Sequence, residues 1–144
     1  MISFARRHLD RSLPPFLRRL AHFLFRTYYN MGDCIFCKIV AGTANADIVY
    51  KDEHVTAFRD IHPVSPTHIL LVPNKHIESV NTLEASDEHI VGHIFTVARK
   101  IALDEGIAGR GYRLITNTGA DGGQTVFHLH VHLIGGGRMK YPMG

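Results

Sequence analysis

The stretch 128–134 reads His-Leu-His-Val-His-Leu-Ile, and it decides the fold class and the chemistry that we predict. Side chains of a β-strand point alternately to its two faces. A strand over 126–134 therefore places His128, His130 and His132 on one face and turns the residues between them toward a core. Three aligned imidazoles can bind a metal ion, or one can act as a nucleophile beside two orienting neighbours. The alternative is a histidine-rich face that only meets solvent.

A glycine-rich loop at 118–123 precedes this strand and follows another predicted strand at 112–117. Because glycine has no side chain, the backbone N–H groups of such a loop stay accessible to an anion. Gln124 and Thr125 add neutral donors next to the histidine row. Taken alone, a Gly-Gly pair also fits an ordinary hairpin turn. Beside three histidines, the loop predicts chemistry on a phosphate group.

The rest of the chain alternates short β-rich runs with two helical segments. Ser86 is predicted to cap a long helix over 88–103, where apolar residues recur at helical spacing until Gly106. This order predicts an α+β fold, with one long and one short helix on an antiparallel sheet of about five strands. The other predicted elements are a short helix at 34–41, a hairpin of 47–50 and 55–60 around a turn at 51–53, and a buried strand at 68–72.

Length and composition limit the class of protein. The 144 residues are 45% hydrophobic and 20% charged, which is typical of one globular domain. No apolar run is long enough for a membrane-spanning helix, and two cysteines cannot build a disulfide scaffold. The net charge of +3 comes from residues 1–30, which hold six arginines and one acidic residue. The basic pI therefore belongs to this segment and does not indicate nucleic-acid binding by the rest of the chain. We expect no nucleic acid as a partner.

Residues 1–31 are predicted to be a basic amphipathic extension to a domain at 32–144. Apolar residues recur at helical spacing over 16–28 against arginines, and Pro14 and Pro15 separate this helix from a shorter basic stretch. Such a segment is typical of an organelle transit peptide or a membrane-surface helix, or results from a start codon placed too far upstream. It has no small-residue cleavage site after a long uninterrupted apolar region, so we do not expect a secretory signal. We expect a cytoplasmic protein, with organelle targeting left open and membrane contact restricted to this extension.

The chain resembles the histidine triad superfamily, and within it the branch of histidine triad nucleotide-binding proteins. The resemblance covers about residues 32–144 and rests on blocks of sequence at 34–39, 57–61, 66–73 and 122–134, with a Gly-Gly-Gly-Arg ending at 135–138. It implies a homodimer that pairs through the helix at 88–103 and a neighbouring strand. It also implies a purine nucleoside phosphoramidase, which hydrolyses the P–N bond of nucleoside 5′-phosphoramidates through a nucleotidyl-histidine. The alternatives are a dinucleoside polyphosphate hydrolase, a nucleotide-binding interaction module with residual activity, and a zinc protein whose triad binds a catalytic metal.

The resemblance also assigns roles to residues. His130 would be the nucleophile that attacks the α-phosphorus, and His132 and His68 would assist it. No cofactor would be required for catalysis. The positions that match the family's nucleotide-binding residues are Ile35, Phe36, Ile39, Phe58, Asp60, Ile61, Asn117, Gly123, Gln124, Thr125 and the N–H of Val131. For the apolar members, and for Ile39 above all, ordinary core packing is the alternative.

Two cysteines raise the question of a structural zinc ion. Cys34 and Cys37 have the Cys-x-x-Cys spacing of zinc sites and redox pairs. Some bacterial-type members of the superfamily bind zinc with such a pair and two histidines. The matching histidines here are His76 and His128, so the resemblance implies a Cys₂His₂ site. Two buried thiols without a metal are the alternative.

Overall fold

The computed structural model describes Pro14 and residues 33–139. The chain divides into two units, Met1–Asp33 and Cys34–Gly144, and the helices and strands given below belong to the second. The predicted amphipathic helix over 16–28 and the predicted domain boundary at Met31 lie outside the described residues. Within the described part of the chain, no helix is both long and apolar enough to cross a membrane.

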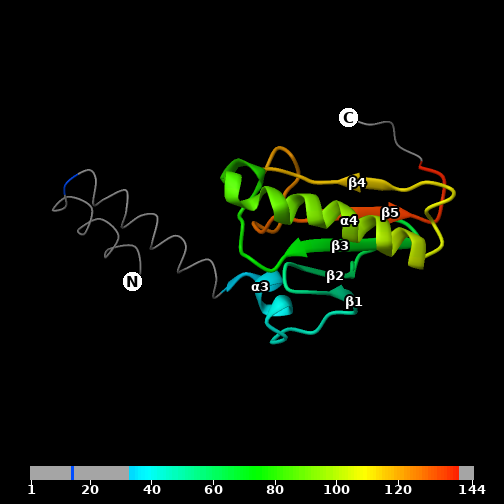
Figure 1. The fold of residues 1–144 in the computed structure, drawn as a ribbon, viewed down its shortest axis with the longest axis horizontal. Helices are drawn as coiled ribbons and strands as arrows, with labels where there is room; N and C mark the ends of the chain where they lie inside the picture. The colour runs from blue at the N-terminus through cyan, green and yellow to red at the C-terminus, as the bar shows by residue number, and fades with distance from the viewer. Residues whose placement is uncertain (1–13, 15–32, 140–144) are drawn as a thin grey trace. The chain divides into compact units, whose positions relative to one another are not determined.

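Five antiparallel strands form one sheet, which confirms the predicted α+β class (Figure 1). The short and the long helix are also present, as α3 (Ile35–Val40) and α4 (Glu88–Asp104). Two single turns of 3₁₀ helix, Val80–Thr82 and Ala85–Asp87, lead into α4. In their order across the sheet the strands are β1 (Ile48–Lys51), β2 (Val55–Arg59), β3 (Thr67–Pro73), β5 (Val131–Gly135) and β4 (Arg113–Ile115).

The sheet has a hydrophobic core on each face, because alternate side chains of the central strands point to opposite sides. Every residue of β3 is buried, which requires both of its faces to be covered. The larger core packs α4 against the sheet through residues such as Ile69, Leu71, Ile94 and Leu133; α4 crosses the front of the sheet in Figure 1. The smaller core joins α3 to the other face through Phe36, Ile39, Phe58, Leu70 and Val72.

The two ends of α4 differ in how well the sequence predicted them. Gly106 follows the last turn with a φ of 68°, and Ile107 N–H donates to the Ala102 carbonyl, as expected for a glycine-terminated helix. The predicted cap at Ser86 is wrong. Ser86 lies in the preceding 3₁₀ turn, and the buried Asp87 carboxylate instead accepts from Glu84 N–H and Lys75 Nζ. The Lys75 ion pair and this turn therefore fix where α4 begins.

The histidine strand is shorter than predicted. β5 begins at Val131, and residues 126–130 are irregular rather than extended in the sheet. This segment is held instead by other contacts, among them Leu129 N–H donating to the Ile77 carbonyl at 2.6 Å. A strand starting at residue 126 is therefore wrong, since the partner strand β3 ends its pairing at the Leu71–Val131 position. Only His132 of the three histidines lies in the sheet.

Candidate active site

His130 is buried just before β5, with 4% of its surface exposed. Its Nδ1 lies 2.7 Å from the backbone carbonyl oxygen of His128. A carbonyl can only accept, so Nδ1 carries the proton and Nε2 keeps a free lone pair. The Phe36 ring packs edge-on against the His130 ring at 5.3 Å between centroids and fixes its orientation. The imidazole is therefore held in the tautomer that a nucleophile needs.

His132 and His68 lie beside it, on adjacent strands β5 and β3. His68 Nδ1 accepts from Val64 N–H at 3.3 Å, which leaves the His68 proton on Nε2. His68 Nε2 lies 2.9 Å from His132 Nδ1, and therefore donates to it. The proton of His132 is then on Nε2, which is a free donor next to His130, whose ring centroid is 5.0 Å away. The carboxylate of Asp60, 3.4 Å from His68 Nε2, adds a negative charge to the group.

Burial keeps His132 and His68 neutral near pH 7. It lowers the pKa of His132 to about 4, with the positive forms of His130 and His68 as further causes. Burial also lowers the pKa of His68, and the nearby Asp60 carboxylate opposes this effect. A neutral imidazole is both the donor and the acceptor that the chain of hydrogen bonds requires.

Cys34, Cys37, His76 and His128 form a second cluster, on the side of α3. Cys34 is the N-cap of α3, and its Sγ accepts from Cys37 N–H, so both thiols face the same side of the first turn. His128 Nδ1 lies 3.4 Å from Cys34 Sγ, and His76 Nδ1 lies 3.2 Å from Cys37 Sγ. The four ligand atoms all lie within 4.8 Å of one another. This is the donor set of a tetrahedral Cys₂His₂ zinc site.

The groups around the cluster fit a metal ion as well. His128 Nε2 lies 2.8 Å from the Pro73 carbonyl, so its proton is on Nε2 and the lone pair of Nδ1 faces the thiols. A backbone carbonyl on the outer nitrogen is the usual support of a metal-binding histidine. Burial lowers the pKa of His128 to about 4, and burial followed by the neighbouring Cys34 raises the pKa of Cys37 to about 12. A bound cation would favour the thiolate and so reverse the effect on Cys37.

The predicted base-binding residues fall into two groups. Phe36, Ile39 and Phe58 are buried in the smaller core, and the rings of Phe36 and Phe58 touch at 5.4 Å between centroids. Ile35 and Ile61 are exposed, Ile61 by 84%. Only these two are open to a base in this structure, because the other three already pack against each other.

The predicted phosphate-binding residues of the loop differ in how far they are exposed to solvent. Gln124 is buried, its Oε1 accepting from Gly119 N–H and its Nε2 donating to the Glu78 and Val126 carbonyls. It therefore shapes the loop. Gly123 and Thr125 are exposed, Asn117 is half-buried, and Val131 turns its side chain into the larger core.

Thr116 contributes to the site, although the sequence pattern did not predict a role for it. Its hydroxyl donates to the His130 carbonyl at 2.9 Å and so ties the histidine segment to the strand beside it. A threonine at the end of a predicted strand is unremarkable, and only the pairing of β4 with β5 would have indicated this contact.

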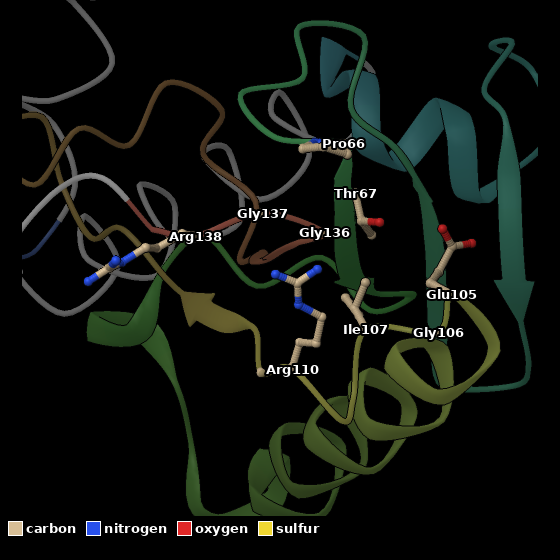
Figure 2. A pocket seen from close by; sticks show the side chains of 10 residues that line it. Pro66, Thr67, Glu105, Gly106, Ile107, Arg110, Gly136, Gly137 and Arg138 are labelled. Atoms are coloured by element: carbon tan, nitrogen blue, oxygen red, sulfur yellow. The ribbon is translucent and has the colours of Figure 1, made fainter.

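A separate pocket of about 520 Å³ lies beyond the C-terminal end of α4 and contains none of the histidines (Figure 2). Arg110 extends into it, whereas the Glu105 carboxylate points away and pairs with Arg59 at 2.7 Å. Its other lining comes from Thr67, Ile107 and the glycines after β5.

Comparisons with known proteins identify the family to which this chain is similar. Residues 41–139 match the family model of the HIT domain. A purine nucleoside phosphoramidase of Escherichia coli (strain K12) is 55% identical over 104 residues, which are 72% of this chain and 87% of that protein. A HIT-like protein of Synechococcus elongatus is 47% identical over 78% of this chain and 97% of its own. The crystal structure of a HIT family hydrolase from Legionella pneumophila superposes with a TM-score of 0.76 at 44% identity, covering 78% of this chain and all of that one.

Proposed function

The chain belongs to the HIT domain family, and from this membership we propose that it is a purine nucleoside phosphoramidase. Such an enzyme hydrolyses the P–N bond of a nucleoside 5′-phosphoramidate and releases a nucleoside monophosphate and an amine. The observation that carries the proposal is the fixed tautomer of His130, whose Nδ1 is 2.7 Å from the His128 carbonyl. A buried and oriented imidazole with a free Nε2 lone pair is the nucleophile that this reaction needs.

The reaction would proceed in two balanced steps. In the first, His130 Nε2 uses its lone pair to attack the α-phosphorus, the P–N bond breaks, and the amine leaves with a proton. The Nε2–H of His132 is the site's own source of that proton, since its Nδ1 is already held by His68. In the second, water attacks the phosphorus of the nucleotidyl-histidine and passes a proton back to His132 Nε2, the bond between phosphorus and His130 Nε2 breaks, and the monophosphate leaves.

Negative charge grows on the phosphate oxygens in both steps, and donors already in place lower the barrier. The exposed Thr125 hydroxyl and the backbone of the loop around Gly123 are the donors that the predicted phosphate contacts would use. Asp60, half-buried beside His68, would accept from the ribose hydroxyls, and the exposed Ile35 and Ile61 would cover the purine.

Turnover tests this function directly. Purified protein is given an adenosine 5′-phosphoramidate in one reaction and a diadenosine polyphosphate in another. We expect the phosphoramidate to be hydrolysed much faster, with a nucleotidylated protein detected by mass spectrometry after acid quenching. Preference for the dinucleotide would instead support the polyphosphate hydrolase, and binding without turnover would support the interaction module.

We also propose that Cys34, Cys37, His76 and His128 hold one structural zinc ion per chain. The four ligand atoms and the Pro73 carbonyl behind His128 support this proposal. Zinc held there would tie the start of α3 to His128 in the segment before β5, so chelation should lower the melting temperature, although His130 is not itself a ligand. Metal analysis that finds no zinc in protein that is fully stable would contradict it.

The third proposal is a homodimer through α4. Phe95 and Leu103 on this helix are exposed by 52% and 56%, and β4 lies at the edge of the sheet. Large apolar side chains and an edge strand are both features that a second copy would cover. Light scattering at micromolar concentration should therefore give twice the mass of the chain.

A further inference from the structure

Three histidines gather on the surface far from the triad in sequence. His54 lies in the turn between β1 and β2, and His89 and His93 lie one turn apart near the start of α4. The ring of His54 packs edge-on against both others, with centroid distances of 5.4 Å to His89 and 6.0 Å to His93. The two helical histidines are four residues apart, which places their side chains on the same face of α4.

Asp52 supports this group from behind. Its Oδ2 lies 2.6 Å from His93 Nε2, so His93 donates from Nε2 and keeps the lone pair of its Nδ1 free. The carboxylate is itself fixed, since it accepts from the N–H groups of His54 and Val55 and from the Tyr50 hydroxyl. These hydrogen bonds together hold the pKa of Asp52 well below its usual range against the opposing effect of burial. A histidine that donates to a fixed carboxylate is the common outer support of a metal ligand.

The spacing of the rings suits a shared metal ion. An imidazole nitrogen binds Zn²⁺ at about 2.1 Å, which puts each ring centroid about 3.2 Å from the metal and two tetrahedral ligands about 5.2 Å apart. The centroid distances of 5.4 Å and 6.0 Å are close to this value. The ligand nitrogens of these three histidines do not all lie within 4.8 Å of one another, unlike the ligand atoms of the Cys₂His₂ cluster. A change of side-chain rotamer is therefore needed before they share a metal ion. Because His89 is exposed, a change of its rotamer meets little resistance.

We propose that His54, His89 and His93 form a second metal site, which takes a divalent transition-metal ion of the zinc, nickel and copper class. Imidazole ligands favour these ions. The site is distinct from the active site and from the Cys₂His₂ cluster, and three protein ligands leave at least one position for water. The exposed Glu53 carboxylate, 3.4 Å from His54 Nε2, adds negative charge near the metal. The bound ion would link the turn between β1 and β2, which carries His54, to the first turns of α4, which carry His89 and His93.

Nickel titration tests the proposal on the full chain. Protein loaded with one equivalent of Zn²⁺ is titrated with Ni²⁺ by calorimetry, and its melting temperature is measured with and without Ni²⁺. We expect one Ni²⁺ to bind per chain and to raise the melting temperature. His89→Gln and His93→Gln should each weaken binding by about tenfold or more and remove that stabilisation; Asp52→Asn should weaken it by about 10-fold to 100-fold.

The matched control is His62→Gln, which changes another exposed histidine outside the cluster and should leave Ni²⁺ binding unchanged. Circular dichroism checks that each variant is folded, and His89→Gln is the safest because its side chain is exposed on a helix surface. Equal Ni²⁺ binding by His89→Gln, His93→Gln and the unmodified protein would overturn the proposal, as would no binding at millimolar Ni²⁺.

Discussion

Replacement of His130 by Asn separates the chemistry of this residue from its structural role. The His130 Nδ1–H donates to the His128 carbonyl at 2.7 Å. An asparagine amide N–H can reach a similar position, so the variant keeps a donor there but lacks the Nε2 lone pair that would attack phosphorus in the proposed reaction. The local backbone should therefore persist while the covalent route is lost.

The two effects have different expected sizes. Loss of a covalent nucleophile should lower kcat on the order of 10⁴-fold or more, which corresponds to about 5.5 kcal/mol. The cost in stability is smaller, because the lost ring contacts with Phe36 and His132, at 5.3 Å and 5.0 Å, are worth about 1–2 kcal/mol together. The melting temperature should therefore fall by only some degrees.

Single-turnover hydrolysis of an adenosine 5′-phosphoramidate measures the first effect, and thermal unfolding measures the second. Acid quenching followed by mass spectrometry should detect the nucleotidylated intermediate in the unmodified protein and not in His130→Asn. His62→Gln serves as a matched control for loss of a histidine. Retention of more than about a tenth of the original rate by His130→Asn would refute the assignment of the nucleophile.

Phe95→Glu should convert the dimer into a monomer in light scattering, because it places a charge on the exposed apolar face of α4; an unchanged mass would locate the interface elsewhere. A chain beginning at Met31 should keep its turnover and its dimerisation, both measured as above, since no proposed site residue precedes Cys34. The melting temperature should fall as pH is lowered from 6.5 to 4, because the pKa of His132 is lowered to about 4 and the unfolded chain binds protons that the folded one does not. His132→Asn should reduce that pH dependence without removing it, because the pKa of His128 is also lowered to about 4; an unchanged slope would argue against a neutral, buried His132.

The elements with strong local signals were predictable from the sequence. The apolar stripe and Gly106 placed α4 within one residue at its C-terminal end, and the turn at 51–53 was confirmed because Asp52 closes it through the N–H groups of His54 and Val55. The grouping of the four proposed zinc ligands also follows the spacing that the resemblance implied.

Other features depend on contacts between distant segments, which a sequence pattern does not contain. The alternation at 126–130 predicted a strand, yet β3 offers no partner before Val131. Gln124 was expected to face a phosphate, and only the positions of Glu78 and Gly119 show that its amide is already bonded. Ser86 has the right side chain for a cap, but the ion pair of Lys75 with Asp87 fixes a different turn.

The sheet order gives the histidine segment a particular place in biosynthesis. β5 is the last of the described strands in sequence, yet it lies between β3 and β4 in the sheet. When this segment is synthesised, the residues of β1, β2, β3 and α4 are already part of the chain, but the strand that pairs with the free edge of β3 is not. Pairing over such a long separation is slow, and an open edge invites association with other chains. The proposed nucleophile, His130, directly precedes β5, the strand that completes the sheet, so we expect activity to appear only once the fold is complete.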